Sequence, residues 1–201
     1  MVGDEPPSHF LINAALRRGA RSRHALPRTP FLVGALLPDV PLAVLSLGTY
    51  LRARLDGGRD TGAVMRDAFD ERYFREPLWI AAHNLFHAPL LLAVPLVLLW
   101  RQRHRHASRL RWAFWLFAGC AVHTLIDLAT HYDDGPVIFF PFAWTIGLHS
   151  PVSYWDRRHF GSQFFVLEVG LDSALIACLA WPSIRRWLTR HRANLALWRR
   201  P

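Results

Sequence analysis

Long apolar runs separated by short polar segments make up most of this chain. Four runs, residues 31–51, 78–100, 112–130 and 163–182, approach the ~20 apolar residues with which an α-helix crosses the hydrocarbon core of a bilayer. The pattern predicts an all-α, polytopic membrane bundle of about four transmembrane helices, with a soluble bundle of very apolar helices as the alternative. A length of 201 residues predicts a single domain.

The first apolar run is interrupted at residues 38–41, which read Pro-Asp-Val-Pro. Because proline removes a backbone donor and clashes with the preceding turn, we expect the first helix to be broken at Pro38 and Asp39. A broken or re-entrant helix is tolerated in a membrane where its freed backbone lines protein or water. We expect the other three helices to be uninterrupted, and residues 52–77 to form an amphipathic segment at the outer surface.

Arginine supplies the whole basic surplus of this chain, whose net charge is +9, and its placement predicts an orientation. Residues 17–28 and 101–111 hold five arginines each and the tail 183–201 holds six, all without an acidic residue. Residues 52–77 balance six arginines against six acids, and residues 131–162 hold two against three. The positive-inside rule therefore predicts cytoplasmic termini. Arginines that flank apolar runs also argue against nucleic acid as a partner.

Histidine and aspartate side chains lie at helical spacing inside two of the runs. His123, Asp127 and His131 follow one another in steps of four along the third run, so they share one helix face. His83 and His87 open the second run with the same spacing. Polar side chains in a membrane helix point into the bundle rather than toward lipid. Imidazole with carboxylate suits Zn²⁺, so we predict a metal site.

Each of the other carboxylates in the apolar runs has two interpretations, as a metal ligand or as a structural residue. Asp39 is a candidate metal ligand and equally a candidate cap of the helix that follows it. Glu168 and Asp172, four residues apart in the fourth run, are candidate ligands, or they pair with Arg157 or Arg158, which we slightly favour.

The spacing along the third run also bears on the number of ions. His123 and His131 are about 12 Å apart along a helix that rises 1.5 Å per residue, which is too far for both to bind one ion easily. Asp127 lies between them and is able to bridge two ions. We therefore expect one or two divalent ions, one near His123 and a second near His131.

Several of these motifs resemble a known family. The stretch from Gly34 to Asp39, the histidines that open the second run, and the stretch from His123 to Asp127 are similar to the bacterial inner-membrane metal-dependent hydrolases of the YdjM type. That family resembles in turn the all-helical zinc phospholipase C and P1 nuclease group. The stretch from His131 to Asp134 and residues 150–156 extend the resemblance, which covers most of residues 9–160. It implies metal ligation by Asp39, His83 or His87, His123, Asp127 and the early histidine His9.

The function implied by the resemblance is hydrolysis of a phosphoester, in a lipid or lipid-linked substrate reached laterally from the outer leaflet. A bound divalent ion activates water for such a reaction. Asp133, Asp134 or Glu168 is expected near the outer mouth and is a candidate general base. Arg157 and Arg158 are candidates for holding the phosphate.

Three other functions remain open from the sequence. Histidines on the second and third runs suit axial ligation of haem, although Asp39 and Asp127 favour zinc, manganese or magnesium over haem iron. The same polar residues suit an ion or proton path. A non-catalytic scaffold would use them to join helices through hydrogen bonds of about 0.6 kcal/mol each.

Overall fold

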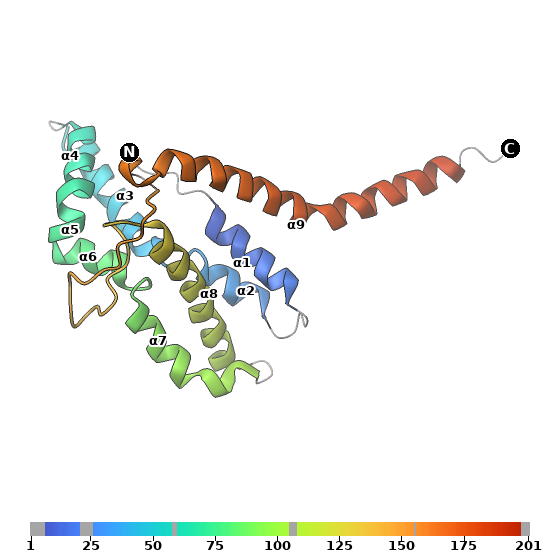
Figure 1. Cartoon of the computed structure of the whole chain (residues 1–201), viewed down its shortest axis with the longest axis horizontal. Helices are drawn as coiled ribbons and strands as arrows, with labels where there is room; N and C mark the ends of the chain where they lie inside the picture. The colour runs from blue at the N-terminus through green and yellow to red at the C-terminus, as the bar shows by residue number, and fades with distance from the viewer. Residues whose placement is uncertain (1–6, 21–25, 58–59, 105–107, 155, 198–201) are drawn as a thin grey trace.

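Helices form all of the regular structure in the part of the chain that is described. The computed structural model describes residues 7–20, 26–57, 60–104, 108–154 and 156–197, and within these ranges it holds no β-strand, only an isolated bridge between Val137 and Gly147. Helices α1 to α8 pack into a bundle, and α9 passes along one side of it and extends beyond it (Figure 1). The predicted all-α class is confirmed.

Two helices are long and apolar enough to cross a membrane by length and composition, namely α8 (Arg109–Thr130) and, over Gly161–His191, α9 (Gly161–Leu197). Two bent pairs pass the same test if each pair is one span. They are α2 (Arg28–Gly34) with α3 (Asp39–Leu55), bent by 52°, and α6 (Pro77–Asn84) with α7 (Pro89–Leu98), bent by 41°. The described residues therefore hold two to four candidate spans, as expected of a membrane protein.

The break in the first apolar run lies where its prolines predict it. Helix α2 ends at Gly34, and α3 begins at Asp39 with Pro38 in the N-cap position. The second run does not form the uninterrupted helix that we expected. Because Pro89 lacks a backbone donor and disfavours helical geometry in the residue before it, Ala88 is extended and α6 stops at Asn84. His87 consequently lies in a turn between two helices.

Helices α2 and α8 approach each other through glycine. A Cβ atom on Gly34 would collide with the carbonyl oxygen of Leu116, and one on Gly119 would collide with the carbonyl oxygen of Phe31. Small residues allow this close backbone approach between helices in membranes. The contact holds the first broken pair against the helix that carries His123 and Asp127.

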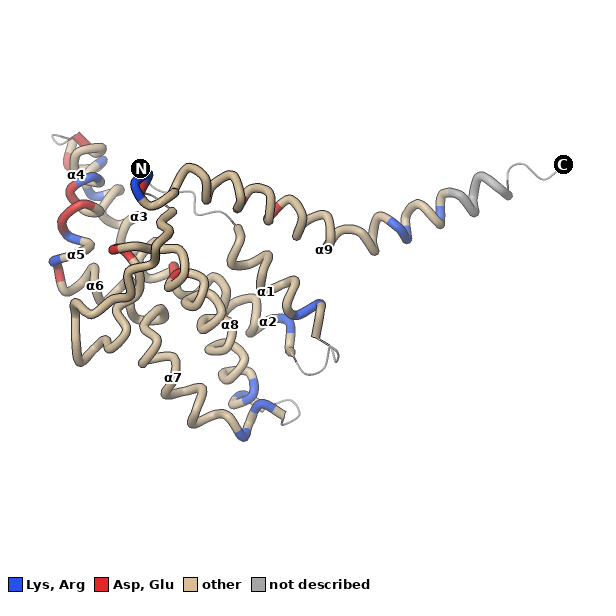
Figure 2. Tube along the Cα trace, viewed as in Figure 1, with Lys and Arg blue, Asp and Glu red and all other residues tan. Residues whose placement is uncertain are grey.

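The segment predicted to be amphipathic is helical in its described part. It continues α3 and then forms α4 (Thr61–Asp67), the π-helix η1 (Ala68–Arg72) and α5 (Tyr73–Arg75). Acidic residues and arginines are mixed in this segment. Where α1 is followed by α2, and where α7 is followed by α8, the charged residues that are described are all arginines (Figure 2). The short 3₁₀-helix η2 (Trp100–His104) follows α7. Arg21, Arg23, Arg105 and residues 198–201 of the predicted basic segments lie outside the described residues.

An additional helix, α1 (Ser8–Gly19), lies beside α9 and runs in the same direction. The Ser8 hydroxyl donates to Glu168 near the start of α9, and Arg18 donates to the carbonyl oxygen of Cys178 one to two turns past Asp172. The starts of α1 and α9 are therefore at the same end of the bundle. The side of the membrane on which each terminus lies stays a prediction.

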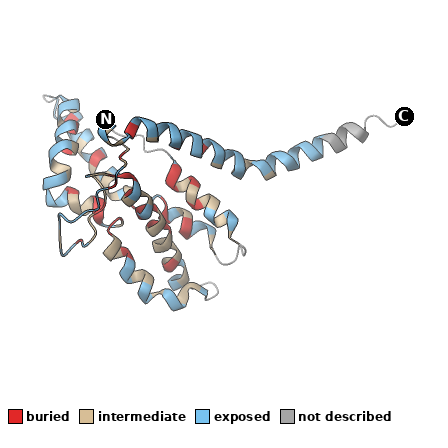
Figure 3. Cartoon of the chain, in the orientation of Figure 1, coloured by how far each residue is buried: buried red, intermediate tan, exposed pale blue. Residues whose placement is uncertain are grey.

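Most of α9 is uncovered by the rest of the protein (Figure 3). Its exposed side chains include Phe165, Val166, Leu167 and Ile176. An exposed apolar surface of this extent is unfavourable in water and suits contact with lipid or protein. Between α8 and α9, residues 131–154 and 156–160 form mostly irregular structure, which includes the 3₁₀-helix η3 (Arg157–His159).

Candidate metal centre

Four polar atoms from three parts of the chain converge inside the bundle. The Nε2 atoms of His87 and His123 are 3.1 Å apart. Each lies 3.3–3.4 Å from Oδ1 of Asp39 and 3.1–3.2 Å from Oδ2 of Asp127. An ion held tetrahedrally at roughly 2.05 Å, as zinc is, separates its ligand atoms by about 3.3 Å. These five separations therefore have the size that a zinc-like ligand shell requires, and the ligand atoms of Asp39, His87 and His123 all lie within 4.8 Å of one another. We call His87, His123, Asp39 and Asp127 the four-residue centre.

The break between α2 and α3 and the break between α6 and α7 both bring residues to α8 at this centre. His123 and Asp127 lie one turn apart on α8, Asp39 is the first residue of α3, and His87 lies in the turn between α6 and α7. Pro38 occupies the N-cap of α3, and the Asp39 carboxylate lies against the two histidines. The geometry therefore favours the ligand reading of Asp39 over the cap reading.

The proton positions of the two histidines follow from their other nitrogen atoms. Nδ1 of His87 is 2.6 Å from the carbonyl oxygen of His83, and Nδ1 of His123 is 2.8 Å from that of Ala35. Because a carbonyl oxygen only accepts, each Nδ1 carries a proton, and the neutral form of each ring has its lone pair at Nε2. In that neutral form two lone pairs and two carboxylates face one another, an arrangement that a cation stabilises.

Burial differs sharply among the four side chains. The side chains of His87, His123 and Asp127 are 2%, 1% and 5% exposed, whereas that of Asp39 is 42% exposed. Leu36 and Val40, on either side of this aspartate in the chain, are exposed as well. The centre is therefore closed on three sides and open at Asp39, next to apolar surface.

His9 reaches the centre from α1, as the family resemblance implies. Its Nδ1 is 2.8 Å from Nδ1 of His123, and its Nε2 is 3.3 Å from Oδ1 of Asp127. Burial lowers the pKa of His9 to about 4, so the ring is neutral near pH 7. The single Nδ1 proton of His123 faces both the carbonyl oxygen of Ala35 and Nδ1 of His9, while Nε2 of His9 contacts Asp127 without a hydrogen bond of good geometry.

One alternative grouping involves His9 directly. His9, His123 and Asp127 place one ligand atom each within 4.8 Å of one another, which is close enough for a shared ion. An ion bound through Nδ1 of His123, the atom next to His9, would require that nitrogen to give up its hydrogen bond to Ala35. The hydrogen bonds therefore favour His9 as a residue that orients Asp127.

The second oxygen of Asp127 faces away from the four-residue centre. This buried Oδ1 accepts no hydrogen bond of good geometry, although Nε2 of His9 lies 3.3 Å away and Nε2 of His131 lies 3.9 Å away. His131 in turn contacts Asp134 through Nδ1, at 3.0 Å. His83 is buried with no hydrogen bond at either ring nitrogen and stacks on His87, with ring centroids 4.6 Å apart. The structure thus brings all seven predicted ligands into one region, and the second ion stays a prediction.

Glu168 has partners other than those we favoured from the sequence. Its Oε1 accepts from the Ser8 hydroxyl at 2.6 Å and from the Tyr154 hydroxyl at 2.7 Å, while its buried Oε2 has no hydrogen bond. Burial and then Glu168 raise the pKa of Tyr154 well above its ordinary value. The pairing of Glu168 or Asp172 with Arg157 or Arg158 is therefore wrong: Arg158 pairs with Asp156 instead.

The remaining predicted site residues lie toward the surface. Asp133 is exposed, and Asp134 is half-buried beside His131. Arg158 is on η3, with its side chain 85% exposed and 2.8 Å from Asp156, whose pKa its hydrogen bonds lower. Arg157 is exposed on the same short helix. Among the described contacts, neither arginine touches the four-residue centre.

Several contributors to the site carried no signal in the sequence. The carbonyl groups of His83 and Ala35 act through the backbone, and Ser8 and Tyr154 are ordinary hydroxyl residues until the fold brings them to Glu168.

Searches against protein-family models, curated proteins and solved structures returned no match.

Proposed function

We propose that this protein is a membrane-embedded metal-dependent hydrolase that acts on phosphoesters of lipids or lipid-linked molecules. The observation that carries the proposal is the four-residue centre, in which two bare imidazole nitrogens and two carboxylates converge at the spacing of a ligand shell. The resemblance to inner-membrane hydrolases supplies the reaction class.

The donor set decides which ions fit. Two imidazole nitrogens and two carboxylate oxygens suit zinc, and next manganese. A divalent ion of this kind supplies a coordinated water of lowered pKa and polarises a phosphoryl oxygen. A four-ligand shell with no open position is typical of structural zinc, so hydrolysis needs a side at which water gains access. The exposed carboxylate of Asp39 provides that side.

The residues around the centre have two proposed roles, which are to orient the metal ligands and to act as the general base. His9 and the carbonyls of His83 and Ala35 hold Asp127, His87 and His123 in their orientations. Of the three candidate bases, Asp134 is best placed, because it contacts His131, and Nε2 of His131 lies 3.9 Å from Oδ1 of Asp127. Glu168 is already engaged by two hydroxyl donors.

Access to the centre supports an amphiphilic substrate. The one open side lies at Asp39, between the exposed apolar side chains of Leu36 and Val40. In a bilayer such a surface faces lipid, so a phosphoester with an acyl or prenyl chain would approach without leaving the membrane.

The geometry disfavours haem binding, and it is compatible with a proton path or a scaffold. Axial haem ligands lie on opposite sides of the iron, with the macrocycle between them. Nε2 atoms only 3.1 Å apart leave no room for one, which disfavours haem ligation by His87 and His123. A proton path or a scaffold fits the same buried residues, and only a functional measurement separates these from a hydrolase.

The test is hydrolysis by purified protein in mixed micelles. Chelator-treated protein, reloaded with zinc or manganese, is offered a chromogenic phosphodiester and a phospholipid. We expect activity that requires the ion and falls at least about 100-fold in Asp127→Asn, with His191→Ala, a change at an exposed helix position, as the matched control. Metal-loaded wild type without activity on either substrate would overturn the hydrolase and leave the scaffold or the proton path.

A further inference from the structure

The C-terminal part of α9 lies beyond the bundle and beyond the apolar residues that are able to cross a bilayer. Residues 163–182 span about 30 Å at 1.5 Å per residue, which matches the thickness of the hydrocarbon core. The helix nevertheless continues to Leu197, with Pro182 inside it. Its course changes direction partway along and then points away from the bundle (Figure 1). We call residues 183–197 the terminal segment, and no step of the proposed hydrolysis uses it.

The terminal segment has an apolar face and a basic face. Ile184, Trp187 and Leu188 are spaced three and four residues apart, so they lie on one side of the helix, and all three are exposed. Arg186 and Arg190 lie on the other side and are exposed as well. Within the described part of the chain, neither arginine forms an ion pair with a carboxylate. The bundle therefore covers neither face of this amphipathic helix.

The charge of the terminal segment has a single sign. Asp172 is the last acidic residue of the chain, and residues 183–201 hold six arginines. Arg18 donates to the carbonyl oxygen of Cys178, so the end of α1, where residues 17–28 hold five arginines and no acid, lies at the same end of the bundle. A surface that complements this end is anionic and accepts apolar side chains.

We propose that the terminal segment lies along the membrane surface at this end of the bundle and binds the headgroups of anionic phospholipids. Its apolar face then lies at the boundary between headgroups and acyl chains, where interfacial helices bury theirs. Trp187 takes the depth that tryptophan prefers in membranes. Arg186 and Arg190 face the lipid phosphates, which attract basic residues near the membrane surface.

Two other placements of the terminal segment are less favourable. A segment that continued straight into water would leave the apolar side chains of Ile184, Trp187 and Leu188 hydrated. A second copy of the chain packed on this face would offer the same arginines and no acidic residue to pair with them. An anionic lipid surface satisfies both faces of the helix at once.

Spin labelling of the full chain in lipid nanodiscs tests how the segment is oriented. Nitroxides are attached at Leu188→Cys on the apolar face and at Thr189→Cys outside it, with Cys178→Ser as background because Cys120 is buried. In phosphatidylglycerol, the ratio of collisions with oxygen to collisions with a soluble nickel chelate should be at least about 3-fold higher at position 188, since an interfacial helix buries only that face.

Two results of this measurement would overturn the proposal. Equal collision ratios at positions 188 and 189 would mean that the segment does not lie in the interface. Spin–spin broadening at position 188 that disappears on dilution with unlabelled protein would mean that a second copy covers the apolar face.

The charge requirement is tested with the same label at position 188, whose spectrum separates a lipid-bound from a released component. Arg186→Gln/Arg190→Gln should shift the ratio of bound to released segment about 30-fold toward release, the typical effect of two interfacial charges. Arg52→Gln/Arg54→Gln removes the same charge from exposed positions on α3 and should change the ratio by less than about two-fold. Equal shifts in both variants, no shift in the first, or the same ratio in phosphatidylcholine as in phosphatidylglycerol would each overturn the proposal.

Discussion

Two backbone carbonyls set the chemistry of the four-residue centre at the scale of single residues. Ala35 and His83 each accept a hydrogen bond from Nδ1 of a histidine, so that Nε2 of His123 and Nε2 of His87 face the carboxylates. Backbone acceptors cannot be lost by mutation of their own side chains. The orientation of both rings is thus determined by the two helix breaks.

His9 provides the first prediction, because it contacts Nδ1 of His123 and Oδ1 of Asp127 and not the atoms of these residues that face the centre. His9→Ala should weaken zinc binding by about 10–100-fold without abolishing it, as loss of a residue that orients a ligand typically does. Competition with a chromogenic chelator measures the change. Loss of the metal as complete as in His123→Ala would mean that His9 is itself a ligand.

The hydroxyl of Tyr154 provides the second prediction. Tyr154→Phe removes one of the two donors to the buried Glu168 carboxylate and should lower the free energy of unfolding by about 1.5–3 kcal/mol, the range for a hydrogen bond to a charged group. Equilibrium unfolding in detergent measures this, with Tyr50→Phe at an exposed position as the control. An equal effect of both substitutions would argue against the Glu168 contact.

Much of the residue pattern could be predicted from spacing alone. Steps of four placed His123, Asp127 and His131 on one helix face, and all three lie in the same region of the structure. The partners of Glu168 could not be predicted, because Ser8 is 160 residues away in the chain. Such contacts depend on how whole helices pack, which the sequence of one helix does not specify.

At the scale of helices, the two proline breaks place the ligands. The break before Asp39 was predicted from its two flanking prolines, whereas the break at residues 85–88 was missed. The signal for it was Pro89, which the expectation of an uninterrupted helix over residues 78–100 left out of account. Proline does not always end a helix, because Pro95 lies inside α7.

Pro89 provides the third prediction. Pro89→Ala removes the restriction on Ala88 and allows α6 to continue, which would carry His87 away from Asp39 and Asp127. Zinc affinity should fall by at least about 10-fold, as for other changes that misorient a ligand. Chelator competition measures it. Pro95→Ala, inside α7, should leave the affinity unchanged, and similar losses in both variants would contradict the role of the break.

The glycine contact between α2 and α8 provides the fourth prediction. Gly119→Ala places a methyl group against the carbonyl oxygen of Phe31 and should destabilise the protein by about 1–3 kcal/mol, the usual cost of overpacking. Gly48→Ala meets no atom within 4 Å and should stabilise α3 by about 0.5–1 kcal/mol. Equilibrium unfolding in detergent compares the two. The same sign for both would show that α2 and α8 are not in close contact.

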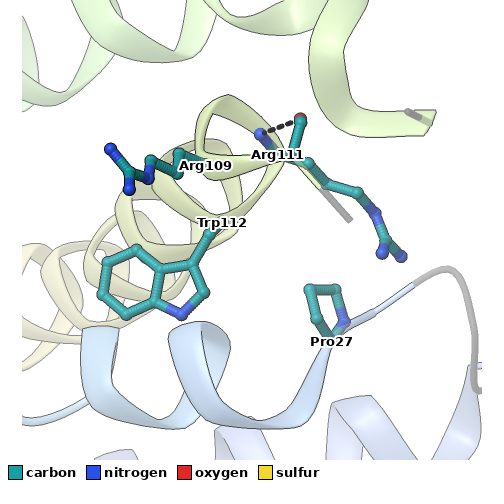
Figure 4. A pocket seen from close by; sticks show the side chains of 5 residues that line it. Pro27, Arg109, Arg111 and Trp112 are labelled. Carbon is teal, nitrogen blue, oxygen red and sulfur yellow. Dashed lines mark hydrogen bonds between the residues drawn. The ribbon is translucent and has the colours of Figure 1, made fainter. Parts of the chain in front are cut away.

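At the scale of the whole molecule, two regions lie at opposite ends of α8. The four-residue centre lies toward the end where α1 and α9 begin. A cleft lies at the other end (Figure 4), lined by Pro27, Ser108, Arg109, Arg111 and Trp112. The unequal distribution of arginine along the sequence predicted two different ends. Their separate contents could not be predicted, since the cleft depends on how the start of α2 meets α8 and the centre depends on two helix breaks.

The central claim is that the buried histidine and aspartate residues bind a divalent metal. Plasma mass spectrometry of detergent-purified protein, with folding checked by circular dichroism, tests it most directly. We predict about one equivalent of zinc or manganese, or about two if the second ion binds, in wild type and in His191→Ala, lost in folded His123→Ala and Asp127→Ala. Metal-free wild type, or equal metal content in all four proteins, would contradict the account.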